Sequence, residues 1–140
     1  MKIRIYQVNL GRDEKRVAFQ GLEGEDGQRE INSAIYDCVF SGEVDCNGLE
    51  DVFQKFNIAH PDGYKGRSLS VSDVVEVIEA TDIEPGFYFC DSIGFKEVEF
   101  DPDKAEPYKD EKIKVLMVEP GKKAYEKEIG TSLQEMYTAL

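Results

Sequence analysis

Isoleucines alternate with charged residues at the start of the chain, where residues 2–8 place Lys2 and Arg4 between hydrophobic neighbours. A period of two residues is typical of a half-buried β-strand. Residues 16–20 form a second, shorter candidate strand. Residues 21–32 have no hydrophobic period and are rich in Gly, Glu, Asp and Gln, so we expect an exposed loop there.

Residues 33–44 predict the next strand, because aromatic and β-branched side chains favour an extended backbone. Within it, the alternation predicts that Tyr36, Cys38 and Phe40 point to one face. A helix is predicted over residues 47–57, where hydrophobic residues recur at i, i+3, i+4 and i+7. The resulting stripe consists of Leu49, Val52, Phe53 and Phe56. The expected N-terminal capping box consists of Asn47 and Glu50.

Residues 66–77, with the sequence GRSLSVSDVVEV, could begin a helix or a strand. Four β-branched residues in five positions, starting at Val74, would lose side-chain rotamer freedom in a helix, so we expect a strand. Two runs dense in aromatic residues follow and are joined by a turn at residues 91–94. Together these segments predict a three-stranded antiparallel meander over residues 74–100, in which Asp73 caps a turn rather than performing catalysis.

Residues 101–112 contain two prolines and eight charged residues, a composition typical of a linker. Beyond it we expect two strands and the start of a helix within residues 113–140, a partial β-β-α unit that is too small to bury a core alone. Thr131 or Ser132 could cap that helix. The chain therefore divides into a domain of residues 1–100, the linker, and an appendage that we expect to be truncated.

The predicted fold class is α+β: a mostly antiparallel sheet with one main packed helix, followed by the short β-β-α appendage. Hydrophobic residues make up 41% and charged residues 33% of the 140 positions, a composition typical of a globular protein. A chain of this length can bury one self-sufficient core.

The chain carries 29 acidic and 17 basic residues, a formal net charge of −12. This charge repels phosphate backbones, so direct nucleic-acid binding is not expected. The excess acid either keeps the protein soluble or, aligned on one face, imitates the phosphates of DNA. No apolar run approaches the roughly 20 residues of a membrane-spanning helix. Three cysteines without a C-x-x-C pattern indicate reduced thiols, and the start of the chain has no apolar signal region, so we expect a cytoplasmic location.

His60 is the only histidine, so a Ser-His-Asp triad would require it, and sites with several histidine ligands are excluded. A nucleophile pair of His60 with Cys38 or Cys90 is an alternative, but a cysteine in an aromatic strand usually belongs to the core. The sequence EPGKKAY lacks the spaced first glycine of a phosphate-binding loop, and a second Lys follows its Gly-Lys pair. We therefore expect no catalytic residue, no cofactor and no metal site.

Polar and basic residues gather in the loop before the meander, and loops on a rigid scaffold often carry binding functions. The candidate partner-binding residues are Tyr64, Lys65, Arg67, Ser68 and Ser70, together with Asp91 and Ser92 of the hairpin turn. Lys65 and Arg67 could engage a carboxylate, a phosphate or a backbone group of a protein partner. In the alternative, Arg67 pairs with a neighbouring acid while Ser68 and Ser70 satisfy the backbone of the turn. Exposed strand edges could also recruit a second copy and form a homodimer.

Four stretches carry a resemblance to a known family: IYDCVFSGEVDC, LEDVFQKFN, HPDGYKGRSLSVSDVVEV and FYFCDSIGFKEVEF. Over residues 2–100 the chain resembles the YodL-like domain, a bacterial domain of large multidomain proteins on conjugative elements and phages. Residues 113–140 resemble the opening of a second small domain of unknown function from the same proteins. The resemblance implies a setting that accompanies DNA transfer and counters host defence, including restriction. No catalytic residue of the family can be carried over, and the 21–32 loop departs from the longer connection expected there.

These observations lead us to expect a non-enzymatic interaction module that binds a protein partner. The first alternative is an acidic DNA mimic that acts as an antirestriction or anti-defence inhibitor, with carboxylates in rows spaced like phosphates. The second alternative is an enzyme whose site the sequence does not reveal. The arrangement of the acidic residues on the folded surface distinguishes the first two.

Overall fold

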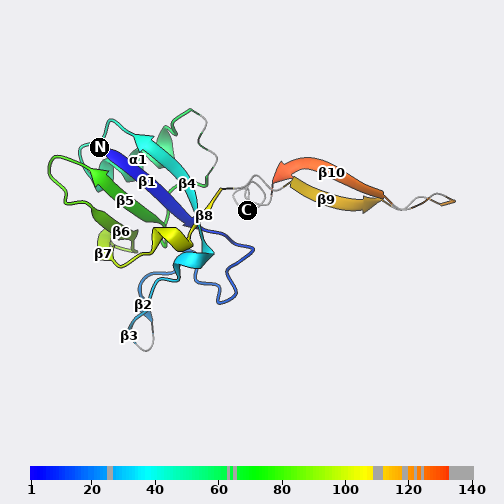
Figure 1. Cartoon of the computed structure of the whole chain (residues 1–140), viewed down its shortest axis with the longest axis horizontal. Helices are drawn as coiled ribbons and strands as arrows, with labels where there is room; N and C mark the ends of the chain where they lie inside the picture. Colours follow the sequence, from blue (N-terminus) through cyan, green and yellow to red (C-terminus); the bar gives the residue numbers. More distant parts are fainter. Residues whose placement is uncertain are drawn as a thin grey trace. The chain divides into compact units, whose positions relative to one another are not determined.

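The computed structural model describes residues 1–24, 27–62, 64, 66–108, 112–117, 120, 121, 123 and 125–132. The chain divides into two compact units, Met1–Tyr108 and Lys109–Leu140. The described part of the first unit contains a six-stranded sheet and one α-helix (Figure 1). This unit holds all the candidate binding residues.

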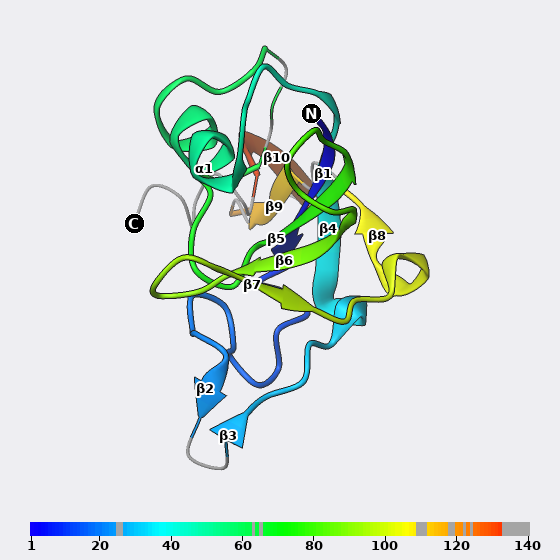
Figure 2. The ribbon, with the colours of Figure 1, turned by 90° about the vertical axis from the view of Figure 1, so that its left-hand side faces the viewer.

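The sheet has the strand order β7-β6-β5-β1-β4-β8 (Figures 1 and 2). Neighbouring strands run antiparallel, except that β8 runs parallel to β4. The strands are β1 (Lys2–Val8), β4 (Tyr36–Glu43), β5 (Val74–Glu79), β6 (Gly86–Cys90), β7 (Phe95–Val98) and β8 (Glu106–Pro107). This architecture confirms the α+β class, the mostly antiparallel sheet and the meander, which β5, β6 and β7 form.

Hydrophobic side chains are buried on both faces of the sheet. The cluster on the side of helix α1 (Leu49–Ile58) consists of Ile3, Ile5, Val44, Cys46, Val52, Phe56, Leu69 and Val75. The cluster on the other side consists of Tyr6, Val8, Leu22, Tyr36, Val74 and Phe89. Because successive residues of a strand point to opposite faces, Val74 and Val75 enter different clusters, and both are fully buried. The predicted helical stripe faces the first cluster and is confirmed.

A β-bulge in β4 separates residues that were predicted to share a face. The pairing of β1 with β4 shifts in register, and Val39 is the extra residue between Cys38 and Phe40. Phe40 therefore packs on the helix side, with its ring centroid 5.0 Å from that of Phe56. Tyr36 and Cys38 pack in the other cluster. The prediction of one common face is wrong for Phe40, because the bulge reverses the alternation.

Helix α1 begins at Leu49, two residues later than predicted, and the expected capping box does not form. The N-cap is Gly48, which has no side chain to accept a hydrogen bond. Instead, the Asp51 carboxylate accepts a hydrogen bond from the backbone N–H of Asn47 at 3.0 Å. An acidic side chain in the first turn is also favourable beside the positive end of the helix dipole. Asp51, rather than Glu50, therefore links the preceding chain to the helix.

The segment between β1 and β4 departs from the sequence predictions. Residues 16–20 contain a turn at Ala18 and Phe19 and no strand. Within the predicted loop, β2 (Glu23–Gly24) pairs with β3 (Gly27–Gln28) in a small hairpin. Leu22 is only 1% exposed, because it packs in the second cluster. Local composition predicted an exposed loop, but this tertiary contact buries part of it.

Residues 101–108, assigned to a linker from composition, contain secondary structure of the first unit. A short 3₁₀ helix, η2 (Pro102–Lys104), precedes β8, which pairs with the start of β4. The backbone N–H of Tyr108 also donates a hydrogen bond to the Cys38 carbonyl oxygen at 3.2 Å. A second 3₁₀ helix, η1 (Ser33–Ile35), directly precedes β4. The first unit therefore continues beyond the predicted boundary at residue 100.

In the second unit, β9 (Lys112–Met117) and β10 (Tyr125–Ser132) form an antiparallel hairpin. Both predicted strands are thereby confirmed. Thr131 and Ser132, expected to cap a helix, lie in the final strand. The predicted helical residues 133–140 lie outside the described residues.

Candidate functional site

Arg67, the central residue of the predicted binding loop, is buried, with 4% of its surface exposed. Its Nη2 atom donates a hydrogen bond to the Val8 carbonyl oxygen at 2.8 Å, and its guanidinium lies 5.4 Å from the centroid of the Phe19 ring. Loss of water around the charge lowers the pKa of Arg67 from its ordinary value. Contrary to the expectation of a docking loop, Arg67 does not present its guanidinium on the surface.

Gln7 of β1 fastens this loop to the sheet and was not recognised from the sequence. Its Nε2 atom donates hydrogen bonds to the Arg67 carbonyl oxygen at 2.9 Å and to Asp73 Oδ2 at 3.0 Å. Its Oε1 atom accepts a hydrogen bond from the Arg67 backbone N–H at 2.9 Å. Gln7 is 1% exposed, and both the nitrogen and the oxygen of its side-chain amide are hydrogen-bonded. Such a side chain has a structural role because a buried amide must satisfy its hydrogen bonds.

Asp73 caps the turn before β5, as predicted. Its Oδ2 atom accepts a hydrogen bond from the Ser70 backbone N–H at 2.8 Å, in addition to that from Gln7. The residue is fully buried, and burial raises the pKa of its carboxyl from 3.8 to about 7. Its Oδ1 atom is buried and has no hydrogen-bond partner among the described residues. Asp73 is therefore a buried carboxyl that titrates near neutral pH.

The other loop candidates also satisfy local backbone groups. The Tyr64 hydroxyl donates a hydrogen bond to the Arg67 carbonyl oxygen at 2.7 Å. The Ser70 hydroxyl donates one to the Ser68 carbonyl oxygen at 3.2 Å, and Ser68 is exposed. Lys65 lies outside the described residues. These contacts support the alternative in which the serines satisfy the turn.

Asp91 and Ser92 lie in the turn between β6 and β7, next to the end of the loop. The Cys90 backbone N–H donates a hydrogen bond to the Asp73 carbonyl oxygen at 2.8 Å, so the meander brings the two candidate segments together. Asp91 is 7% exposed; it pairs with Lys96 Nζ at 3.1 Å and accepts a hydrogen bond from the Ser92 backbone N–H at 2.8 Å. Its carboxylate therefore stabilises the turn.

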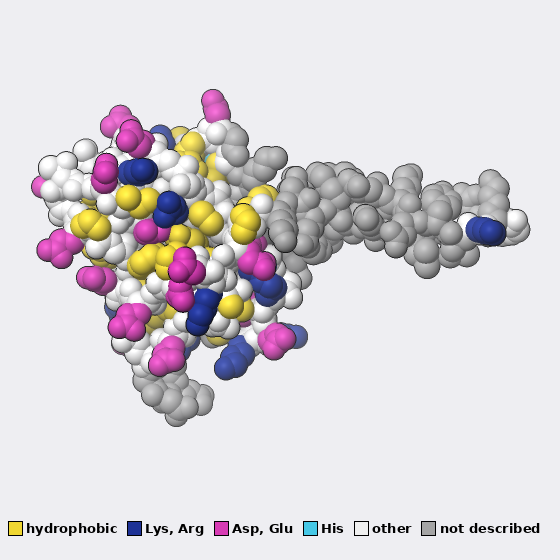
Figure 3. Space-filling view, in the orientation of Figure 1, with side chains coloured by type: hydrophobic (Ala, Val, Ile, Leu, Met, Phe, Trp, Pro, Cys, Tyr) yellow, Lys and Arg dark blue, Asp and Glu magenta, His cyan; other side chains and the backbone are white. Residues whose placement is uncertain are grey.

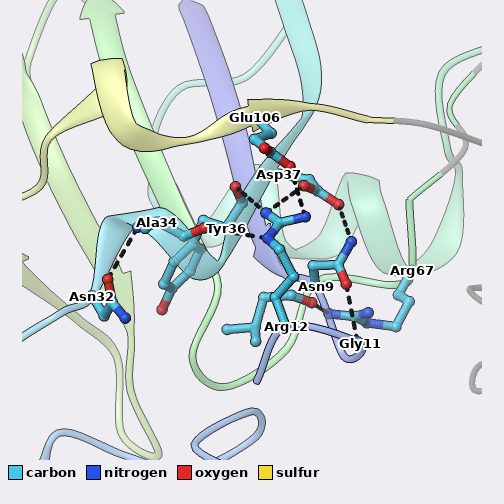
Figure 4. A network of polar contacts seen from close by, with 10 residues as sticks. Asn9, Gly11, Arg12, Asn32, Ala34, Tyr36, Asp37, Arg67 and Glu106 are labelled. Atoms are coloured by element: carbon cyan, nitrogen blue, oxygen red, sulfur yellow. Dashed lines mark hydrogen bonds and ion pairs between the residues drawn. The ribbon is translucent and has the colours of Figure 1, made fainter. Parts of the chain in front are cut away.

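A second polar network, also missed from the sequence, surrounds Arg12 (Figure 4). The guanidinium lies between two carboxylates, with Nη2 at 2.8 Å from Asp37 Oδ1 and Nη1 at 3.0 Å from Glu106 Oε2. Asn9 Nδ2 donates a further hydrogen bond to Asp37 Oδ2 at 2.8 Å. Asp37 is 3% exposed, so these donors replace the water that its carboxylate has lost. The network joins β8 to β4 and leaves no free catalytic carboxylate at Asp37.

Two strained residues meet beside Arg67. Phe19 and Ser72 have φ values of 67° and 84°, a backbone region that residues other than glycine rarely adopt. The Phe19 backbone N–H donates a hydrogen bond to Ser72 Oγ at 2.9 Å, and the Tyr36 hydroxyl donates one to the Ser72 carbonyl oxygen at 2.7 Å. The surrounding contacts thus hold both conformations, and Phe19 remains 51% exposed.

The candidate nucleophiles lie in unreactive surroundings. Burial raises the pKa of the Cys90 thiol to about 12 and also raises the pKa values of Cys38 and Cys46, which disfavours the reactive thiolate. His60 is exposed and its ring lies 5.2 Å from that of Tyr64. In the described part of the chain, no group of three or more His, Cys, Asp and Glu residues could hold a metal ion.

A family model described as the YodL-like domain matches residues 2–100. The chain belongs to this family. No curated protein and no solved structure matches it. Among the described residues of this YodL-like domain protein, no helix is long and apolar enough to cross a membrane. The family assignment agrees with the resemblance found in the sequence.

Two hollows lie on the YodL-like domain near the β2–β3 hairpin. The larger, about 820 Å³, is bounded by residues 11–17 and 29–35. The smaller, about 420 Å³, lies between residues 28–31 and the end of β7. The larger hollow is lined by both acidic and basic side chains, including Arg12, which the network of Asp37 and Glu106 already engages. The smaller hollow borders the outermost strand of the sheet.

Proposed function

We propose that this YodL-like domain protein is a non-enzymatic interaction module that binds a protein partner in the cytoplasm, within the setting of a mobile-element protein. The location of its charge carries the proposal. Residues 1–108 contain 23 of the 29 acidic residues but only 11 of the 17 basic ones, so the whole excess of 12 negative charges lies in the first unit. Such a charge attracts a partner with a basic surface and accelerates association.

The roles of the polar residues inside the domain support binding rather than catalysis. Gln7, Asp73 and Arg67 fasten the loop before β5. Arg12 joins Asp37 of β4 to Glu106 of β8. Catalytic sites keep their reactive groups accessible to a substrate, whereas these groups are engaged within the fold. The raised pKa values of the buried cysteines point in the same direction.

The acidic DNA mimic remains the second candidate, because the same concentration of charge in one unit favours it. A mimic requires rows of carboxylates without interruption by cations. On the face seen in Figure 3, acidic side chains are dispersed, with Lys, Arg and hydrophobic side chains among them. This distribution supports the interaction module over the mimic.

The test is affinity capture from a host-cell lysate with the full chain as bait. We expect a protein partner whose recovery falls several-fold when the salt concentration rises from about 50 mM to about 500 mM. The control bait is an unrelated folded protein of similar net charge, because charge alone captures basic proteins. Capture no better than this control would refute the module. A captured enzyme that is released by duplex DNA would favour the mimic instead.

A further inference from the structure

Strand β7 forms one edge of the sheet (Figure 2), so among the described residues no strand pairs with its outer side. The Cys90 backbone N–H and carbonyl bond to Asp73 and Ser72, on the side of β6 away from β7. Cys90 therefore exchanges no hydrogen bonds with Phe95, its register partner in β7. Since bonded and non-bonded pairs alternate in an antiparallel ladder, the N–H and C=O groups of Phe95 and Glu97 point outward. No described residue pairs with them as a further strand.

The 420 Å³ hollow is a groove at the C-terminal end of this edge, between Glu97–Glu99 and residues 28–31. Its apolar lining residues are Leu22, Ile31 and Val98, which all pack in the second hydrophobic cluster. Its exposed acidic residues are Glu30, Glu97 and Glu99. The site therefore combines a free strand edge, an apolar floor and three carboxylates, of which that of Glu97 projects from the opposite face of β7, toward Gly86.

One basic residue, Arg29, also lines the groove and keeps its charge, so three carboxylates stand against one guanidinium and the lining remains negative. Arg29 donates hydrogen bonds to the Gly21 carbonyl oxygen at 3.0 Å and the Gln20 carbonyl oxygen at 2.8 Å. Its guanidinium also lies 5.4 Å from the centroid of the Phe89 ring. Lys96, the one lysine of β7, is paired with Asp91. A lysine on an edge strand usually discourages the addition of another strand, and this one is engaged elsewhere.

We propose that an extended, Lys- or Arg-bearing segment of a protein partner pairs with β7 as a seventh strand and lies over this groove. The inference rests on the proposed function and identifies the surface that it uses. The backbone groups of Phe95 and Glu97 provide the hydrogen bonds, as in other cases of strand addition, and the glutamates select basic side chains. A second copy of the chain fits less well, because two-fold pairing of β7 with itself brings like charges together.

The first experiment follows amide hydrogen exchange by NMR as a peptide is added to the full chain. The probe is a synthetic peptide of about ten residues that alternates Lys and Val, and the control peptide carries two central prolines, which cannot add to a strand edge. We expect exchange at Phe95 and Glu97 to slow about tenfold or more at saturation. Lys96 and Val98, whose amides already bond to β6, should change little.

Variants separate the backbone contribution from the charge. Glu97→Pro removes an outward N–H without removing a bond to β6, since an edge strand tolerates proline there. We expect it to abolish the protection at Phe95, whereas Glu97→Gln, which retains the N–H, should bind with a small loss.

A triple substitution tests the three glutamates that line the groove without altering the backbone. Replacing the groove glutamates by Gln should weaken peptide binding about 3- to 10-fold, the effect of several exposed charge pairs. The altered residues are Glu30, Glu97 and Glu99. The control makes the same change in net charge at Glu43, Glu79 and Glu84, exposed residues that do not line the groove, and should leave binding within about twofold.

Unchanged exchange at Phe95 and Glu97 with saturating peptide would overturn the proposal. Protection that rises with protein concentration and needs no peptide would also overturn it, in favour of a second copy. If a cellular partner is captured equally well by Glu97→Pro, the interaction module stands and the β7 site fails. If peptide protection is observed but no cellular partner is captured, the edge is competent and the proposed function fails.

Discussion

Replacing Asp73 by Asn isolates the effect of one buried carboxyl on folding. In the folded protein, burial raises the pKa of Asp73 from 3.8 to about 7. At about 1.4 kcal/mol per pKa unit, this difference corresponds to roughly 4 kcal/mol in the free energy of unfolding. Asn retains a carbonyl oxygen that can accept the hydrogen bonds from Gln7 and Ser70, but it does not titrate.

The direction of the change in stability with pH follows from the number of protons that each state binds. Below about pH 4 the Asp73 carboxyl is protonated in both states, and its favourable contribution is complete. Between about pH 4 and 7 the folded protein keeps a proton that the unfolded chain has lost, so the stability of the wild type falls as pH rises. Above about pH 7 the contribution is lost. The wild-type stability minus that of Asp73→Asn should therefore fall by up to about 4 kcal/mol across this range.

Urea unfolding followed by far-UV circular dichroism measures this difference, since the chain has no Trp for fluorescence. Comparing the two proteins at each pH cancels the titration of the other carboxyls. The matched control is Asp82→Asn, which changes an exposed aspartate. A difference that stays flat, or that grows as pH rises, would refute the reasoning. The second result would mean that Asp73 folds as a carboxylate stabilised by the charge of Arg67.

Two further predictions concern the packing of loops onto the sheet. Gly66→Ser should destabilise the protein by about 1–3 kcal/mol, because a Cβ atom there would lie 2.5 Å from the Tyr64 hydroxyl oxygen. The same substitution at Gly48, the N-cap of α1, where the Cβ position is open, should stabilise the protein by a few tenths of a kcal/mol. Equal changes in the Tm of Gly66→Ser and Gly48→Ser would contradict this explanation. Arg12→Ala should cost about 2 kcal/mol in urea unfolding, because Asp37 loses its ion pair while buried. A loss below about 0.5 kcal/mol would show that water replaces the guanidinium.

Patterns confined to one element were predicted well, because neighbours along the chain produce them. The alternation in residues 2–8 corresponds to β1, and the stripe in residues 47–57 corresponds to α1. The β-branched residues that follow Asp73 form β5, as their rotamer preferences indicated. Such signals depend on the periods of strands and helices and do not require the position of any other segment.

The candidate site was predicted less well, because burial depends on distant partners. Arg67 stands in a polar loop, yet the sheet buries it through Val8 and Gln7, about sixty residues earlier. Arg12 and Asp37 likewise meet only when β4 pairs with β1. No local pattern marks these contacts, since the energy of a polar group depends on which donors replace its water.

The α+β class, the meander, the main helix and membership of the YodL-like family could all be predicted from the amino-acid sequence. The bulge at Val39, the complete burial of Asp73 and the position of residues 28–31 beside the end of β7 are evident only in the folded protein. The difference lies in how far apart along the chain the interacting residues are. Periodicity and rotamer preference act between near neighbours, whereas register, desolvation and the shape of a groove arise when distant segments pack together.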